Sequence, residues 1–275
     1  MKKLQYHYIL ALFLVFGFTV SAQKKVNLDE DWKFHFGHAA NPDKDFDYGN
    51  KLLFHKSNVF ETSVVNPKFI DTTWRKINVP HDWVVELPFV KSTTHEMDTH
   101  GYKPVGSTYP ETSIGWYRKH FTIDKKDTDK RFELQFDGIY RNASIWINGF
   151  YVGTNFSGYL GNTYDVTDFM NFEGDNVLVI RVDATQAEGW FYEGAGIYRH
   201  VWLNITDKVF IPEDGVFVYS ETKDKNASIT VETTIQNNHL KTTNAYVYNY
   251  ITDRNGKILA KTSEQKINLG IRKDI

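Results

Sequence analysis

Apolar and polar residues alternate along much of this chain, a pattern typical of strands that bury one face. Two such segments follow each other between Gly115 and Phe136, and a third ends at Asn148-Gly149. Asn-Gly is the preferred pair for a two-residue type I′ hairpin, so we expect the chain to reverse there and predict an antiparallel sheet. The inward positions of these strands are Tyr117, Phe121, Ile123, Phe132, Leu134, Phe136, Ile145 and Ile147.

The segment from Asn176 to Leu203 carries the strongest pattern, because two alternating apolar stretches flank one loop. Strands in this arrangement present the connecting loop at the rim of a β-sandwich. Arg199 shares the inward face of the second stretch, which predicts a buried and paired structural arginine. The other inward positions are Leu178, Ile180, Val182, Ile197, Val201 and Leu203, while Val177, Val179 and Arg181 lie on the opposite face of the first stretch.

The loop between these stretches is rich in aromatic rings. Trp190, Phe191 and Tyr192 precede Glu193 and a glycine-rich turn from Gly194 to Gly196. Two interpretations of the rings are open. They can cap the sandwich core, as large apolar side chains usually do, or they can form the edge of a ligand site. The composition of the loop is compatible with both.

Several short strands separated by turn residues predict an all-β fold, a β-sandwich of the jelly-roll type. We expect Trp32 to Phe36 to form an edge strand, and Asp165 to Met170 to form a turn with one helical turn. Lys208 to Gly215 breaks the alternation and is the expected domain boundary. The predicted domains therefore cover residues 23–207 and 208–275.

Residues 1–22 have the parts of a signal peptide: a positively charged start with Lys2 and Lys3, an apolar run and small residues up to Ala22. The apolar run from Ile9 to Val20 has 12 residues, whereas a bilayer span takes about 20. We therefore expect export to the periplasm or the extracellular space, and no membrane insertion after signal removal. The chain has no cysteine, so neither a disulfide framework nor a cysteine-linked lipid is expected.

The charge balance excludes two classes of partner. The formal net charge is −2 over 275 residues, without a clustered basic segment, and both nucleic acid and an anionic membrane demand such a cluster. Asn41 to Asn66 is polar and irregular, so we expect a solvated surface insertion. Its acids Asp43, Asp45 and Asp47 alternate, but the glycine and distant glutamate of an EF-hand loop are absent, and we predict no calcium site.

Two histidine motifs suggest catalysis, and we reject both. His81-Asp82 could belong to a hydrolase triad, but the chain has no Gly-x-Ser-x-Gly elbow. We instead expect His81 and Asp82 to satisfy backbone groups at a turn, with Trp83 in the core. His95 and His100 are five residues apart, about 140° round a helix, whereas a zincin helix needs histidines at i and i+4. No metal site is therefore predicted.

The chain carries five motifs in this order: N-L-D-E-D-W-K-F from Asn27, V-P-H-D-W from Val79, G-W-Y-R-K-H-F from Gly115, F-D-G-I-Y-R-N-A-S-I-W-I-N-G from Phe136, and E-G-W-F-Y-E-G-A-G-I-Y-R-H-V-W-L from Glu188. Together they resemble the N-terminal sugar-binding domain of glycoside hydrolase family 2, the family of β-galactosidases and β-glucuronidases. The resemblance covers roughly Asn27 to Asn204 and continues more weakly to the end.

The resemblance implies a galactose-binding-like jelly roll followed by a truncated immunoglobulin-like domain. It also implies that a loop of the first domain reaches the sugar pocket of the family's catalytic domain. Where this chain has Trp190, some β-galactosidases have an aspartate, so aromatic packing on the sugar is favoured over polar contact. The substrate-binding candidates are Trp190, Phe191, Tyr192 and Glu193 of that loop, and Tyr102, Lys103 and Tyr109 of the long irregular segment from Lys91 to Ile114.

In the resembled family two glutamates on a (β/α)8 barrel cut the glycosidic bond, and such a barrel takes about 250 residues. This sequence reads as strands nearly throughout, so the catalytic pair is expected to be absent, and Glu111, Glu188 and Glu193 are not nominated for it. We expect the non-catalytic N-terminal portion of an exported β-galactosidase-like glycosidase. The alternatives are a free-standing carbohydrate-binding module and a truncated product without independent function.

The resemblance also indicates the partners. A β-linked galactoside or related glycan is the implied ligand, and the full-length enzyme can form a homo-oligomer. No cofactor is expected in this chain, although full-length relatives can use Mg²⁺ or Na⁺.

Overall fold

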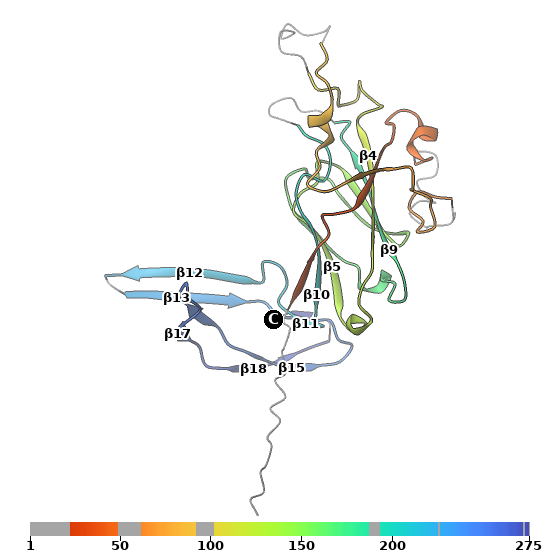
Figure 1. The fold of residues 1–275 in the computed structure, drawn as a ribbon. Helices are drawn as coiled ribbons and strands as arrows, with labels where there is room; N and C mark the ends of the chain where they lie inside the picture. The colour runs from red at the N-terminus through yellow and green to blue at the C-terminus, as the bar shows by residue number, and fades with distance from the viewer. Residues whose placement is uncertain are drawn as a thin grey trace, which may run out of the picture.

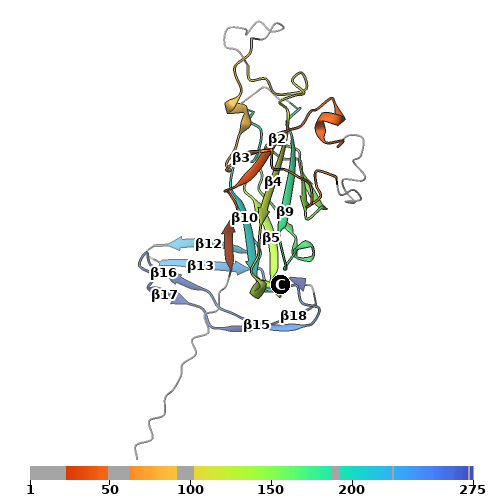
Figure 2. The ribbon, with the colours of Figure 1, turned by 45° about the vertical axis from the view of Figure 1, so that its right-hand side comes forward.

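The computed structural model describes residues 23–48, 62–91, 102–186, 193–224, 226–271 and 273–274. Throughout these ranges the strands pair antiparallel and the only helices are short 3-10 turns. A six-stranded and a four-stranded sheet pack face to face, and smaller sheets follow them in the chain (Figure 1, Figure 2). The predicted all-β sandwich is therefore confirmed.

The six-stranded sheet has the order β3-β2-β4-β9-β6-β7. At the turn between β6 and β7, Asn148 and Gly149 have φ angles of 52° and 85°, which confirms the predicted type I′ hairpin. The prediction that Trp32 to Phe36 lies at an edge is wrong, since this strand pairs with β3 and β4 on either side. The strands are β2 (Trp32–Phe36), β3 (Arg75–Ile77), β4 (Ile114–Phe121), β6 (Ala143–Ile147), β7 (Phe150–Asn155) and β9 (Asn176–Asp183).

The four-stranded sheet has the order β1-β10-β5-β8. Its strands are β1 (Lys24–Asn27), β5 (Arg131–Phe136), β8 (Asn162–Asp165) and β10 (Val201–Thr206). The 3-10 turns of the sandwich are η1 (Pro42–Asp45), η2 (Trp83–Glu86), η3 (Lys125–Asp127) and η4 (Thr167–Phe169). The last of these confirms the helical turn predicted between β8 and β9.

The main core lies between the two sheets. It is built from the inward positions of the alternating segments, such as Tyr117, Leu134, Ile180 and Leu203, which are all buried. Each fully buried side chain of this size contributes about 1.5–3 kcal/mol relative to an exposed one. The alternation in the sequence therefore marks the face of each strand that the opposite sheet covers.

A second core covers the other face of the six-stranded sheet. Trp116, Trp146, Val177 and Val179 point outward from that sheet, and Trp74, Val64 and Val65 pack against them. The Trp116 and Trp146 rings stack with their centroids 5.9 Å apart. The described parts of the segment from Asn41 to Asn66 thus form a cover over this sheet, and the prediction of a solvated insertion is wrong for them.

Asp45 shows why this cover is stable. Its side chain is buried, and its Oδ2 accepts hydrogen bonds from Arg181 Nε at 3.0 Å and Nη2 at 2.8 Å. Its Oδ1 accepts a third from Trp116 Nε1 at 2.7 Å. A charge-assisted pair of this kind offsets the cost of burying two charges only when nearly all of its hydrogen-bonding atoms are used.

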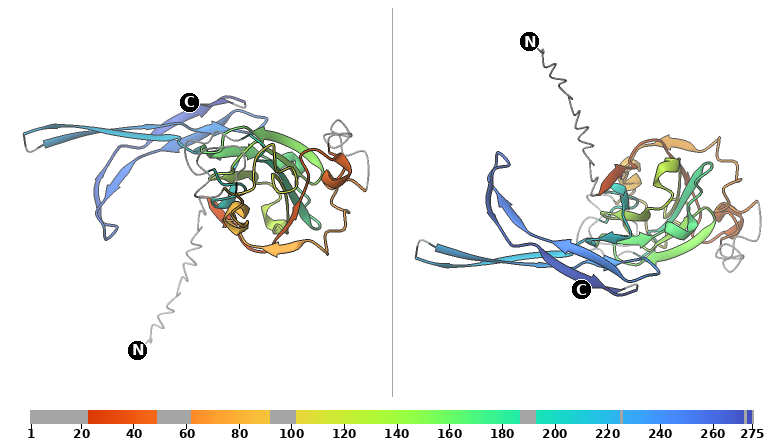
Figure 3. Two further views of the ribbon diagram at one scale, coloured as in Figure 1. Left: turned by 90° about the horizontal axis from the view of Figure 1, so that it is seen from above. Right: turned by 90° about the horizontal axis from the view of Figure 1, so that it is seen from below.

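After β10 the chain forms small sheets that project away from the sandwich (Figure 3). Both faces of the β12–β13 hairpin are largely open, and Phe217 is 60% exposed. Within the described ranges, none of the helices has the length and apolar character that a bilayer crossing requires. The strands are β11 (Val209–Phe210), β12 (Val216–Lys223), β13 (Asn226–Thr233), β14 (Gln236–Asn237), β15 (Thr243–Val247), β16 (Tyr250–Thr252), β17 (Ile258–Lys261), β18 (Gln265–Leu269) and β19 (Lys273–Asp274).

The ion pair between Asp45 and Arg181 gives a stability prediction. Asp45→Ala leaves the buried Arg181 guanidinium without its main partner, so the free energy of unfolding should fall by about 3–5 kcal/mol in urea denaturation. Asp43→Ala, on the exposed side of the same turn, is the control and should change it by less than about 0.5 kcal/mol. Equal effects of the two substitutions would contradict the assignment.

Candidate functional site

Two segments that carry predicted site residues are held against the turn η2 where the structure describes them, and we call them the first and the second arm. Of the first arm, Trp190, Phe191 and Tyr192 lie outside the described residues, and the description resumes at the half-buried Glu193. The second arm carries Tyr102 and Lys103. The described contacts show how each arm is held.

Asp82 fixes the end of the first arm. Its Oδ1 accepts hydrogen bonds from the backbone N–H of Val84 at 3.0 Å, as the N-cap of η2, and from that of Ala195 at 2.9 Å. The backbone adds two bonds to the same contact, from Trp83 N–H to the Ala195 carbonyl and from His81 N–H to the Ile197 carbonyl. The predictions that Asp82 satisfies backbone groups and that Trp83 is buried are therefore confirmed.

The two glycines of this arm are required by the close approach to the turn. A Cβ on Gly194 would lie 2.4 Å from Asp82 Oδ2. Gly196 has a φ of +123°, and a Cβ there would lie 2.4 Å from both the His81 carbonyl oxygen and Tyr117 Oη. Only glycine combines that backbone conformation with the absence of a side chain.

His81 has a different role from the predicted one, because its ring bonds to side chains. Arg75 Nη2 lies 2.7 Å from His81 Nε2, and a guanidinium can only donate, so Nε2 accepts. The proton is then on Nδ1, which donates to Tyr117 Oη at 2.8 Å. Burial lowers the pKa of His81 below its ordinary 6.5, although the Glu86 carboxylate at 3.3 Å acts in the opposite direction.

The partner of this histidine is equally enclosed. Burial raises the pKa of Tyr117 well above its ordinary 10.0, while a hydrogen bond with the Ile197 backbone acts in the opposite direction. His81 is 7% exposed and Tyr117 is fully buried. The pair is therefore neutral at pH 7 and supports the loop end at Gly196 from within the core.

The second arm is tied to the opposite end of η2. Lys103 Nζ donates to the carbonyls of Leu87 at 2.5 Å and Val85 at 3.2 Å, and it lies 4.3 Å from the centre of the Phe89 ring. Tyr102 exchanges two backbone hydrogen bonds with Val90. Glu193, which precedes the fixed Ala195 by two residues, thus lies near the start of η2, and Lys103 lies at its end.

Tyr109 is further along and belongs to a separate turn. Its carbonyl accepts a hydrogen bond from Ser113 Oγ at 2.7 Å, and Ser113 is fully buried. Tyr109 is half-buried, and its backbone supports the start of β4 through Ser113.

Tyr140 contacts the end of the first arm, and it is not among the site residues predicted from the sequence. It exchanges backbone hydrogen bonds of 2.9 and 2.7 Å with Gly196, and its ring lies edge-on to Tyr159 at 5.6 Å. Burial raises the pKa of Tyr140 above its ordinary value, and the negative charge of Glu193 raises this pKa further. The available signal was its place in the motif that begins at Phe136.

The prediction that Arg199 is buried and paired is wrong. The chain leaves the strand conformation between Ile197 and His200, and β10 begins only at Val201. The alternation of inward and outward positions does not extend through this irregular stretch, and the Arg199 side chain is exposed.

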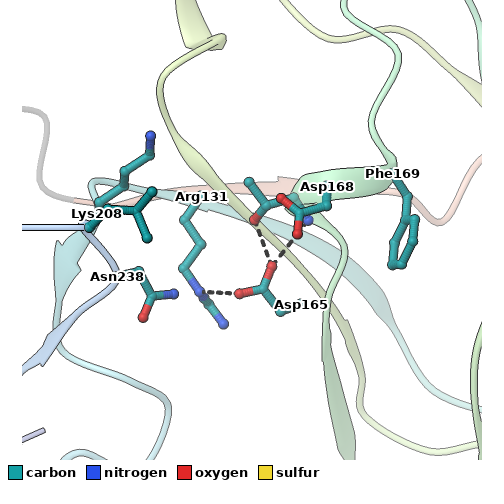
Figure 4. A pocket seen from close by; sticks show the side chains of 8 residues that line it. Arg131, Asp165, Asp168, Phe169, Lys208 and Asn238 are labelled. Atoms are coloured by element: carbon teal, nitrogen blue, oxygen red, sulfur yellow. Dashed lines mark hydrogen bonds and ion pairs between the residues drawn. The ribbon is translucent and has the colours of Figure 1, made fainter. Parts of the chain in front are cut away.

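A hollow of about 480 Å³ lies at the other end of the sandwich, where Lys208 and Asn238 approach β5 and η4 (Figure 4). Arg131 donates to Asp165 at 2.9 Å and to Glu133 at 2.6 Å. The Thr167 amide and hydroxyl occupy the other oxygen of Asp165. The Arg131 guanidinium and the Asp165 carboxylate in this hollow are therefore bonded to groups of the chain itself. Among the described residues, no group of three or more His, Asp or Glu side chains could hold a metal ion.

Comparisons with known proteins fit this architecture. The sequence matches the family described as glycosyl hydrolases family 2, sugar binding domain, over residues 58–207. It is 32% identical over 245 residues to the β-galactosidase BoGH2A of Bacteroides ovatus. This alignment covers 88% of this chain and 25% of that protein. It is 28% identical over 268 residues to a β-glucuronidase of Formosa agariphila, covering 90% of this chain and 24% of that protein.

Solved structures give the same picture. A glycosyl hydrolase family 2 member from Bacteroides cellulosilyticus superposes with a TM-score of 0.70 at 28% identity, over 91% of this chain and 30% of that one. A β-glucuronidase of glycoside hydrolase family 2 superposes with a TM-score of 0.73 at 25% identity, over 94% of this chain and 26% of that one. The chain spans about a quarter of the length of the curated relatives it matches.

The buried His81 gives a pH prediction. Its pKa in the folded protein lies below the value of 6.5 in the unfolded chain, so the unfolded chain takes up the proton first as the pH falls. The free energy of unfolding should therefore decrease from about pH 6.5 downward. In urea denaturation at pH 7.5 and 5.5, His81→Gln should show a smaller difference between the two pH values than the unsubstituted protein. The control His239→Gln, in the bend between β14 and β15, should keep the full difference, and a full difference in His81→Gln would contradict the prediction.

Proposed function

The chain belongs to glycoside hydrolase family 2, and on that basis we propose that it is the N-terminal, non-catalytic portion of an exported β-galactosidase-like glycosidase. One observation carries this proposal: 88% of the chain aligns with only 25% of the Bacteroides ovatus β-galactosidase. The share of that enzyme with no counterpart here is large enough to contain a complete catalytic domain.

The architecture of the described residues supports the non-catalytic assignment. Retaining glycosidases need two carboxyl groups about 5–5.5 Å apart, and a (β/α)8 barrel builds such a pair from parallel strands alternating with helices. The strand pairs described for this chain are antiparallel, and no α-helix joins them. The proposed full enzyme therefore takes its acid pair from another part of the polypeptide.

The proposed contribution of this chain is a rim that contacts sugar. Trp190, Phe191, Tyr192 and Glu193 would form one side of it, and Tyr102, Lys103 and Tyr109 the other. The contacts at η2 support this role, because Asp82 and Lys103 fix both arms without help from a ligand. An aromatic ring at Trp190 suits packing against the C–H face of a β-linked galactoside or related glycan.

Export and domain organisation are part of the same proposal. The signal-peptide pattern of residues 1–22 leads us to place the mature protein in the periplasm or outside the cell. Residues 23–207 would form the jelly roll, and residues 208–275 the start of an immunoglobulin-like domain. A homo-oligomer of the full enzyme is a separate part of the proposal, based on the family resemblance.

A glycosidase assay tests the proposal. The purified chain should show no measurable turnover of chromogenic β-galactosides under conditions where the Bacteroides ovatus β-galactosidase is active. Substantial turnover by these 275 residues would refute the non-catalytic assignment. A folded chain that binds oligosaccharide by itself, with weaker binding after Trp190→Ala, would favour the free-standing carbohydrate-binding module instead.

A further inference from the structure

The outer face of the four-stranded sheet carries mostly polar side chains, which lie in rows across its paired strands. Trp202 of β10 lies opposite Gln135 of β5, which lies opposite Thr163 of β8. One pair further along, Asn204 lies opposite Lys25 of β1. Because these residues alternate with the core positions of the same strands, their side chains point away from the sandwich core.

The segment that follows the sandwich passes over this face and leaves a groove beneath it. One hollow of about 520 Å³ is lined by Asp137, Asn162, Thr163 and Arg199, and a second of about 370 Å³ by Lys25, Asn204, Ile211 and Pro212. Gln135 and Glu213 line both hollows, so the two hollows adjoin each other across the hydrogen bond between these residues, and together we call them the groove.

The floor of the groove is a connected set of hydrogen bonds. Gln135 Nε2 donates to Asp137 at 3.1 Å and to Glu213 at 2.8 Å, and Gln135 Oε1 accepts from Asn204 Nδ2 at 3.0 Å. Trp202 Nε1 donates to the other oxygen of Asp137 at 2.9 Å. These bonds orient the amides and carboxylates before any ligand arrives, which lowers the entropic cost of binding.

One buried atom of the groove lacks a partner. The Asn204 residue is 3% exposed, and its Oδ1 accepts no hydrogen bond from the residues that the structure describes. Leaving such an atom unsatisfied costs about 1–3 kcal/mol, but the atom is inaccessible from the groove, so a ligand has to bond to the other polar groups of the lining. At the other end, the exposed Arg199 guanidinium supplies donors to the larger hollow.

The lining selects the chemistry of the ligand. Asp137, Glu213 and Asp214 outnumber the single cation Arg199 in the larger hollow, which disfavours an anionic ligand. Burial also raises the pKa of the Glu213 carboxyl, while Lys25 acts in the opposite direction. Sugar hydroxyls both donate and accept, as this mixed lining requires. Leu160, which is 68% exposed, offers apolar surface for a pyranose ring.

We propose that this groove is a binding site for a neutral oligosaccharide. Hydroxyl groups bond to Gln135, Asp137 and Arg199, and the ring C–H groups lie against Leu160. The site is separate from the rim at η2 and does not depend on the loop that contains Trp190.

The indole N–H of Trp202 provides a local test, because it donates to Asp137 within the groove. In a ¹H–¹⁵N spectrum of the full chain, its signal is assigned by comparison with Trp202→Phe. The chain is titrated with neutral disaccharides, namely β-1,4-galactobiose, lactose, cellobiose and mannobiose. At least one should shift this signal saturably below about 10 mM, whereas digalacturonate should bind at least about tenfold more weakly.

Two variants and one control complete the test. Arg199→Gln and Gln135→Leu should each weaken the binding about tenfold or more, because each removes a hydrogen bond to the sugar. Arg254→Gln, the same change at an exposed arginine in the turn between β16 and β17, should leave the affinity unchanged. Thermal unfolding confirms that each variant is folded.

Three results would overturn the proposal. The first is no saturable shift of the Trp202 indole with any of the four sugars, and the second is a shift that persists unchanged in folded Arg199→Gln. The third is binding that moves the Trp190 indole and leaves Trp202 in place. That third result would support the rim at η2, so the two sites are distinguished.

Discussion

The fold around the rim depends on one carboxylate that serves two segments. Asp82 caps η2 through Val84 and, with the same oxygen, holds the backbone of Ala195, 113 residues further along the chain. A charge-assisted bond of this kind is worth about 1.5–3 kcal/mol, more than a neutral one. The aromatic loop before Gly194 therefore ends at a fixed point, and binding energy need not be spent on ordering that end.

Strands could be predicted because each buries one face, and alternation records that face directly. β9 shows this well: Leu178, Ile180 and Val182 enter the main core, and Val177 and Val179 enter the second. Charged residues were predicted poorly, since their burial depends on a partner that local sequence does not show. Asp45 was expected in solvent and instead pairs with Arg181, 136 residues away.

The candidate site was predictable in part for the same reason. The His-Asp-Trp turn and the Gly-Ala-Gly segment are local patterns with a clear backbone meaning, and the structure joins them. The contact of Tyr140 with Gly196 and the row from Trp202 to Thr163 arise from strand pairing. Arg199 failed because the alternation was extended through a stretch that is not a strand.

The central claim is that Asp82 fixes the loop end without a ligand, and hydrogen exchange at the Ala195 amide tests it most directly. Asp82→Ala should accelerate that exchange about tenfold to a hundredfold, since the lost bond is worth about 1.5–3 kcal/mol. Asp253→Ala, which removes two carboxylate-to-amide bonds in a distant turn, should leave it unchanged. Equal Ala195 exchange in the Asp82→Ala and unsubstituted proteins would contradict the claim.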